Sequence, residues 1–320
     1  MKFPHLFLSN LPKEQKEFLN LLELTAKVHG ETKNPMGKEN VPIWDEDFFH
    51  VKKSETWKSL SAEARNSILV SLSQKILQEA YFIECAGMAY AGKMNLAAKN
   101  KEEREFYCFV GEEEAKHLRM VESLANFSTS LESIPSFSLL IGEIIQEAQR
   151  TSHLLLIQIL LEGWGLNYYK TLAKTAKDEN VAKTFKNIVK DEIRHHSAGV
   201  ILFTNHKNGM SDKEVDEFMG YFERISFMVK VGPYSICEEV FRQFENPSVE
   251  QLKQFLIETN AVVVTSGKME LLGQLIAKSL PDEVLERVKA KGYLTPMSLE
   301  EMTSALSQSI PGIFELAPNR

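Results

Sequence analysis

Apolar residues recur at intervals of three and four along most of this chain, a spacing typical of amphipathic α-helices. The alternating pattern typical of β-strands is nearly absent. The predicted fold class is therefore all-α. The four longest helices are predicted near residues 62–94, 102–123, 152–176 and 179–207. The other helices are predicted near residues 13–28, 137–149, 212–243 with a bend at Gly232 and Pro233, 249–278, 281–291 and 298–307.

Turn-forming and capping residues divide the chain, predicted to be a single domain, into three parts. Residues 1–61 are expected to hold a helix and an irregular arm rich in Gly, Pro and Asn. Residues 62–207 are expected to form the core of four helices, and residues 208–320 a helical extension. Three helices of the extension begin with a capping box, in which a Ser and a Glu or Gln three residues later bond free backbone N–H groups. These pairs are Ser211 with Glu214, Ser248 with Gln251, and Ser298 with Glu301.

Two ionisable residues interrupt the apolar face of the predicted helix 102–123. Positions three, four and seven apart share one face of a helix, so Tyr107, Val110, Glu114, His117 and Val121 form one stripe. The apolar members identify this stripe as the side that packs into the core. Glu114 and His117 are therefore predicted to point inward.

The predicted helix 179–207 repeats this arrangement. Phe185, Ile188, Glu192, His195 and Gly199 form its inward stripe, and Glu and His again stand three residues apart. A single Glu-x-x-His is a weak signal, but the same pattern on two long helices indicates a common purpose.

Each of the two predicted helices with a Glu-x-x-His is preceded along the chain by a helix that has one acidic residue in its apolar face. Glu84 precedes Glu114 by 30 residues, and Glu162 precedes Glu192 by the same interval, which indicates an internal repeat. Glu79 is the alternative for the first of these acids because it also has apolar neighbours, but only Glu84 reproduces the interval.

Four carboxylates and two imidazoles in a dry core require a compensating charge, because an unpaired buried ion costs several kcal/mol. Two divalent or trivalent metal ions would supply it. Carboxylates that bridge, with one nitrogen ligand for each metal, suit iron or manganese and leave positions open for dioxygen, unlike a closed thiolate zinc site.

Glu113 and Asp191 are predicted to support this site. Each would accept a hydrogen bond from the histidine ring of the opposite helix, Asp191 from His117 and Glu113 from His195.

These residues resemble the ferritin-like di-iron carboxylate proteins, whose four-helix core offers one Glu from each of two helices and a Glu-x-x-His from each of the other two. The resemblance covers roughly residues 62–207, and all six ligand positions are filled. The residues at these positions are Glu84, Glu114, His117, Glu162, Glu192 and His195.

The resemblance is closer to the oxygenases of this group than to its other members. Ribonucleotide reductase small subunits usually have a tyrosine at the position that Val121 occupies here. Rubrerythrins have a four-cysteine iron module that is missing here. Ferritin subunits are little longer than their four-helix bundle, whereas this chain extends well beyond it on both sides. The length, the arm with "PIWDEDFF" and the form Asp-Glu-x-x-His resemble the p-aminobenzoate N-oxygenases, although their additional histidine ligand corresponds to Ile188. Acyl carrier protein desaturases share both motifs.

The resemblance implies a di-iron, or manganese–iron, oxygenase or oxidase that uses dioxygen to oxidise a small organic substrate. No flavin or nicotinamide fingerprint is visible, so we expect a separate reductase as electron donor. Two alternatives remain, a ferroxidase that handles iron and a metal-free helical interaction module. A cage of many subunits would favour the ferroxidase, whereas a monomer or homodimer would favour the oxygenase.

Charge and cysteine content agree with a small-molecule partner. The formal charge of −7, from 37 Lys and Arg against 44 Asp and Glu, and the absence of a basic run argue against nucleic acid and anionic membranes. No signal peptide or membrane span is predicted, and three separated cysteines indicate free thiols in a reducing cytoplasm.

Overall fold

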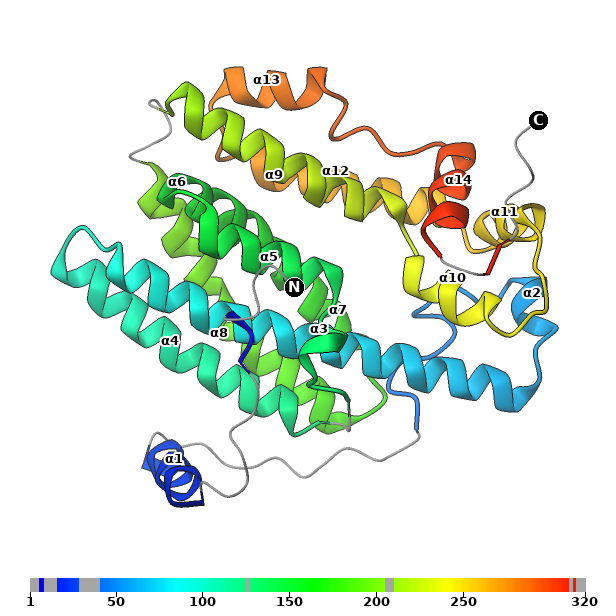
Figure 1. Cartoon of the computed structure of the whole chain (residues 1–320), viewed down its shortest axis with the longest axis horizontal. Coiled ribbons are helices and arrows are strands. Elements are labelled where there is room, and N and C mark those ends of the chain that lie inside the picture. Colours follow the sequence, from blue (N-terminus) through cyan, green and yellow to red (C-terminus); the bar gives the residue numbers. More distant parts are fainter. Residues whose placement is uncertain are drawn as a thin grey trace.

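The structure is a computed structural model that describes residues 6–8, 16–28, 41–124, 127–204, 210–310 and 313–314. All regular elements in these ranges are helices, which confirms the predicted all-α fold class (Figure 1). Predicted helix residues 13–15 and 205–207, and arm residues 30–40, lie outside the described ranges.

Four long helical segments form the core of the molecule (Figure 1). They are α3 (Ala62–Leu96), α4 (Lys101–Glu122), a continuous segment of α6 (Arg150–Ser152), η3 (His153–Leu161) and α7 (Glu162–Thr175), and α8 (Glu179–Thr204). The helix α3 packs along α4, α7 packs along α8, and α4 meets α8. By contrast, α3 and α7 approach each other much less closely. The core therefore consists of two tight helix pairs with a looser side between α3 and α7.

Capping side chains fix where these helices begin. The Ser61 hydroxyl accepts a hydrogen bond from the Ala64 N–H at the start of α3, and Asn100 does the same for Glu103 at the start of α4. The three predicted capping boxes are confirmed at the starts of α9 (Asp212–Val231), α11 (Val249–Glu258) and α14 (Leu299–Ser309).

The middle of the third core segment is π-helical, which the spacing of apolar residues did not predict. Over η3 the backbone bonds five residues back instead of four, and the N–H of Glu162 accordingly donates to Ile157. η3 is almost entirely apolar and buried on all sides, so no amphipathic stripe exists there to reveal the change of period. The wider turns rotate Glu162 relative to its position on an uninterrupted α-helix.

Two predicted long helices of the extension are each broken in two. The helix predicted over 212–243 is divided at Gly232, whose φ of 79° ends α9 before α10 (Tyr234–Phe241). The helix predicted over 249–278 is wrong as a single element, because Asn260 with φ of 52° separates α11 from α12 (Ala261–Ala277). An Asn in the left-handed conformation is tolerated without a glycine signal in the sequence.

The extension covers one side of the core (Figure 1). Here α9 and α12 pack on η3, α12 also packs on α7, and α10 packs on α3. The remaining elements are α1 (Lys16–Val28), α2 (Glu55–Lys58), η2 (Leu131–Ser133), α5 (Ser136–Glu147) and α13 (Asp282–Ala290). The helix α5 packs on α3 and α9, and α2 and α14 pack on α11.

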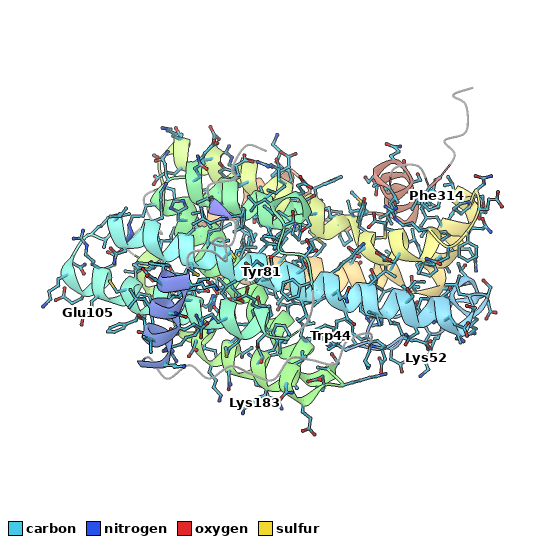
Figure 2. The ribbon with its side chains drawn as sticks, turned by 60° about the horizontal axis from the view of Figure 1, so that its bottom comes forward. Trp44, Lys52, Tyr81, Glu105, Lys183 and Phe314 are labelled. Atoms are coloured by element: carbon cyan, nitrogen blue, oxygen red, sulfur yellow. The ribbon has the colours of Figure 1, made fainter. Side chains whose placement is uncertain are left out.

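The end of the N-terminal arm joins α3 to α7. Trp44 is fully buried, and its indole N–H donates to the carbonyl of Leu172 on α7 at 3.1 Å (Figure 2). The hydroxyl of Ser73 on α3 accepts from the N–H of Ile43 at 3.1 Å, and the carbonyl of Ile43 accepts from Lys177 at 2.9 Å. The arm thus ties together the two core helices that pack least closely on each other.

A small residue sets the approach of α8 to η3. A Cβ at Gly199 would lie 2.7 Å from Cγ and 2.9 Å from Cβ of Gln158, close to the backbone of η3. We expect Gly199→Ala to lower the free energy of unfolding by about 1–3 kcal/mol, because neither backbone can give way easily. Urea unfolding followed by circular dichroism measures this. Gly220→Ala on α9 is the matched control, since its Cβ would meet nothing within 4 Å and helix propensity should stabilise it.

Candidate metal centre

The six predicted ligands come together in the middle of the core. Glu84 comes from α3, Glu114 and His117 from α4, Glu162 from the first turn of α7, and Glu192 and His195 from α8. They form two groups of four that share two glutamates, and within each group one ligand atom from every residue lies within 4.8 Å of the others. The groups are Glu84, Glu114, His117 and Glu192, and Glu114, Glu162, Glu192 and His195. Five of the six side chains are buried, and Glu162 is partly exposed.

The ring of His117 points its Nδ1 atom into the first group. This atom lies 3.2 Å from Glu192 Oε1, 3.4 Å from Glu84 Oε2 and 3.9 Å from Glu114 Oε2. It is buried and has no hydrogen-bond partner in the described part of the chain. A buried nitrogen that faces three carboxylates without bonding any of them fits a metal ligand, since a cation between them would contact all four groups.

His195 occupies the equivalent place in the second group. Its Nδ1 lies 3.0 Å from Glu192 Oε2 and 3.2 Å from Glu114 Oε1. The ring centroids of His117 and His195 are 6.3 Å apart. Glu114 and Glu192 therefore lie between the two imidazole rings, and the Nδ1 atom of each ring faces both carboxylates.

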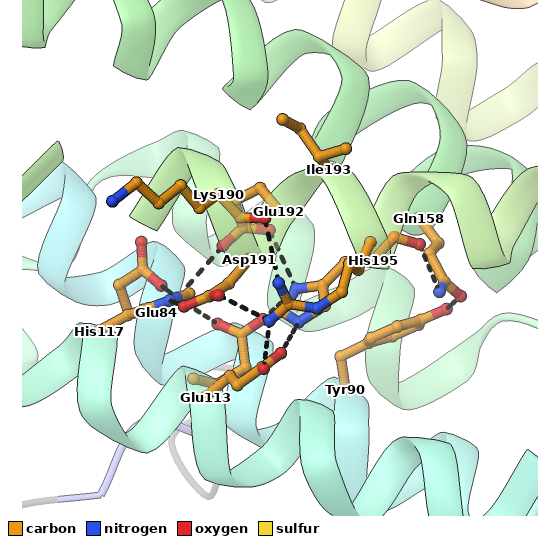
Figure 3. A network of polar contacts seen from close by, with 12 residues as sticks. Glu84, Tyr90, Glu113, His117, Gln158, Lys190, Asp191, Glu192, Ile193 and His195 are labelled. Atoms are coloured by element: carbon orange, nitrogen blue, oxygen red, sulfur yellow. Dashed lines mark hydrogen bonds and ion pairs between the residues drawn. The ribbon is translucent and has the colours of Figure 1, made fainter. Parts of the chain in front are cut away.

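The outer nitrogens of both rings contact the carboxylates named from the sequence (Figure 3). His117 Nε2 lies 3.1 Å from Asp191 Oδ2, and His195 Nε2 lies 2.9 Å from Glu113 Oε2. A proton on each Nε2 would donate to its carboxylate and leave Nδ1 as the free lone pair, the form that a metal requires. Arg194 bonds both Glu113 and Asp191, the latter at 2.6 Å, so the two supports are joined.

Arg194 was missed because its place on the helix resembles that of a solvated residue, and its side chain is indeed half exposed. Its spacing of three residues from Asp191 was the available signal. No contact of Tyr169 with the cluster was predicted from the sequence. Its hydroxyl donates to Glu84 Oε1 at 2.7 Å, which fixes one oxygen of that carboxylate.

Gln158 is a second polar group that the sequence did not assign. Its amide nitrogen donates to the carbonyl of His195 at 2.8 Å, and its Oε1 accepts from the hydroxyls of Tyr90 and Tyr107 at 2.9 and 2.8 Å. None of these bonds is to a side chain of the six candidate ligands, so Gln158 holds the backbone of α8 in place at His195.

Burial and the contacts among its own side chains together set the pKa values of the cluster. Burial raises the pKa of Glu84 to about 7 and, with the neighbouring Glu192, raises the pKa of Glu162 well above its usual range. Burial alone would lower the pKa of His117, but contact with Asp191 and the surrounding glutamates raises it. Contacts with Glu162 and both histidines lower the pKa of Glu192 despite its burial. Without a metal, protons on Glu162 and on the two histidines therefore offset part of the negative charge of the cluster. Metal ions would replace those protons and remove the same cost.

The alternative ligand Glu79 belongs to neither group of four. The nearest charged influence on its carboxyl is Lys268 of α12. The structure thus places Glu84, and not Glu79, beside the other ligands.

Comparison with protein-family models, with curated proteins and with solved structures found no match. None of the helices in the described ranges combines the length and the apolar content that a membrane span needs.

A glycine beside the cluster leads to a prediction about metal content. A Cβ at Gly87 would lie 2.4 Å from Glu114 Oε2 and 2.7 Å from its Cδ. Gly87→Ala should therefore move the Glu114 carboxylate, and the metal content after loading with ferrous iron should fall, as measured by elemental analysis. On the same helix, a Cβ at Gly92 would meet nothing within 4 Å, so Gly92→Ala is the control and should keep the wild-type content.

The contact between His117 and Asp191 leads to a second prediction. Asp191→Asn keeps the size of the side chain but weakens its hold on the histidine N–H. We expect a metal affinity or activity lower by roughly 10–100-fold, the range for such supporting residues, with an unchanged circular dichroism spectrum. Wild-type metal affinity in this variant would mean that the carboxylate has only a surface role.

Proposed function

We propose that the chain is a ferritin-like di-metal protein that activates dioxygen and oxidises a small organic substrate. The observation that supports this most is the convergence of four glutamates and two histidines from four different helices, with both Nδ1 atoms directed into shared carboxylates. The ferritin-like proteins use the same ligands in the same chain order. We propose two iron ions, or one manganese and one iron, because this donor set suits both metals.

The two groups of four suggest a role for each ligand. Glu114 and Glu192 belong to both groups and would contribute to holding both metal ions. Glu84 and His117 would complete the first metal site, and Glu162 and His195 the second. When bound, the metal pair would supply the electrons and the Lewis acidity that dioxygen activation requires.

The protein's own groups would orient, hold protons and exclude water. Asp191 and Glu113 would fix which nitrogen of each histidine is free. Contact with His117, and then with Arg194, lowers the pKa of Asp191, and contacts with His195 and Arg194 lower that of Glu113 despite its burial. Tyr169 donates to Glu84 and sets the direction of its other oxygen. Glu162 is the one partly exposed ligand, so a substrate would approach from its side of the cluster.

A ferroxidase is the second candidate, and a metal-free interaction module the third. The helices α9, α10 and α12 favour oxidation of an organic substrate, because they cover the core instead of leaving it a bare bundle. Gly165 follows Glu162 by three residues on α7, and an added Cβ there would meet nothing within 4 Å. Space beside an accessible ligand suits an organic substrate. An external reductase would supply electrons, and no nucleic acid or membrane partner is proposed.

Iron loading in air separates these candidates. We expect a plateau near two irons per chain even in large excess of ferrous iron, because only six ligands are provided. Glu114→Ala and Glu192→Ala should each lower the plateau, since each removes a shared ligand. Anaerobic ferrous protein exposed to dioxygen should then change its absorption and Mössbauer spectra within one turnover.

Other results of the iron-loading experiment would support the alternatives or contradict the ligand assignment. A curve that climbs to tens of irons per chain, in a particle of many subunits by light scattering, would support the ferroxidase. Full occupancy in both Ala variants would show that the ligand assignment is wrong. A protein without bound metal after loading would support the interaction module.

A further inference from the structure

Exposed apolar side chains gather on three helices of this chain. Eight of the fifteen large apolar side chains that are exposed in the described ranges lie on α1, α4 and α8. On α4 this side chain is Phe109, which is 55% exposed, and on α8 they are Ile193, Val200 and Ile201. They lie outside the inward stripes, among the exposed residues of α4 and α8, which are called the outer face below. Apolar surface that gathers in this way marks an interaction site.

Two contacts at the candidate metal centre fix the register of α4 against α8. Glu113 contacts His195 at 2.9 Å, and His117 contacts Asp191 at 3.1 Å. Residue numbers thus increase along α4 while they decrease along α8, so the two helices are antiparallel. Phe109 lies one turn before Glu113 and comes level with the exposed apolar residues in the last turns of α8.

Charged residues of opposite sign stand at the two ends of the outer face. Each helix has two exposed charges of one sign in the two turns before an exposed apolar residue. These sets are Glu102, Glu105 and Phe109 on α4, and Lys186, Lys190 and Ile193 on α8. Within the described part of the chain, none of the four charged side chains forms an ion pair. Because the helices are antiparallel, one end of the face is acidic and the other is basic.

The two sets match each other in order and in spacing. Their first and last members are seven residues apart in both sets, and the middle members differ by one position. A twofold axis perpendicular to the outer face would lay α4 of one copy over α8 of a second copy, with both helices running in the same direction. Each acidic residue would then meet a basic one, and Phe109 would meet Ile193. The same contacts would occur twice, which is the condition for a symmetric dimer.

We propose that the outer face of α4 and α8 is the interface of a homodimer, in which α4 of each copy packs in parallel on α8 of the other. A second copy fits better than a different protein, because the complement of each set is present on the same face. The face is about 30 Å long and about 20 Å wide, or about 600 Å² on each copy, which is at the lower end of the range for stable interfaces.

The helix α1 borders this face and would enlarge the interface. It meets α4 through Glu23 and Arg119, whose side chains are 3.4 Å apart. In the register of the dimer, Arg119 aligns with residue 203, near the end of α8 of the second copy. The exposed apolar residues of α1 would therefore lie beside the last turns of that helix. These residues are Phe18, Leu21, Leu22 and Leu24.

Arg194 lies near the middle of the interface. Its side chain is half exposed, but it already bonds Glu113 and Asp191, so it would bring no unpaired charge into the contact. The second copy would cover these links and shield from water the carboxylates that contact both candidate histidine ligands. The dimer does not depend on which reaction the metal centre performs.

Sedimentation equilibrium of the full-length chain tests the interface. We expect a dimer at micromolar concentration. Glu102→Lys with Glu105→Lys should weaken it at least about tenfold, because like charges would then face each other, and Lys186→Glu with Lys190→Glu should do the same. The variant with all four changes exchanges the signs of the two ends and keeps them complementary. Its Kd should return to within about threefold of the wild-type value.

Matched variants elsewhere on the surface are the controls. Phe109→Ser should weaken the dimer at least about tenfold, whereas Phe227→Ser should not. Phe227 is 50% exposed but lies on α9, on the opposite side of the core from α4 (Figure 1). Lys278→Glu with Lys291→Glu, in the extension, makes the same change in net charge as the pair on α8 and should leave the dimer intact. Circular dichroism checks that every variant is folded.

Two results would overturn the proposal. One is a wild-type chain that stays monomeric at about 100 μM. The other is a fourfold variant that associates as weakly as the two double variants, because the charges would then not face each other. Iron content is measured on the same samples. A dimer that binds no iron would contradict the di-metal function and keep the interface, whereas a monomer with two irons would do the reverse.

Discussion

The desolvation of four carboxylates around two imidazoles is the constraint on which the rest of the structure depends. Each carboxylate would cost several kcal/mol if it were buried as an unpaired ion, so none could be there without its neighbours. The cost explains the pKa of about 7 for Glu84 and the carboxylates behind both histidine rings. It also fits the close approach of the Glu114 carboxylate on α4 to Gly87 on α3. The helices bury five of the six side chains, and the proposed metal ions would balance the charge of the carboxylates.

The sequence predicted most of the core because the helical period and the inward acids agree there. Glu114 and His117 lie on a clear amphipathic stripe, and the 30-residue interval placed Glu84 and Glu162 on the preceding helices. The interval succeeded because both helix pairs are hairpins of similar length. The contacts of Asp191 with His117 and of Glu113 with His195 were predicted from the same repeat. Each of these two acids directly precedes a candidate glutamate ligand on its own helix.

The remaining features depend on tertiary packing that periodicity does not encode. η3 is apolar all round, so nothing in its composition distinguishes a turn of π-helix from one of α-helix. The break at Asn260 requires a left-handed residue that is not a glycine. The packing of α12 on η3 and α7 joins segments that are far apart in the chain, and no local pattern in the sequence indicates it.

Trp44 gives the N-terminal arm a role beyond covering the core. Its backbone and that of Ile43 bond Ser73 on α3, its indole bonds Leu172 on α7, and its ring lies 6.3 Å from that of Phe185 on α8. A segment from outside the core thus contributes to the separation of α3 and α7. The geometry between these two helices, on which Glu84 and Glu162 lie, is consequently in part a property of the arm, and substitutions at Ile43 or Trp44 can alter the candidate site without touching it.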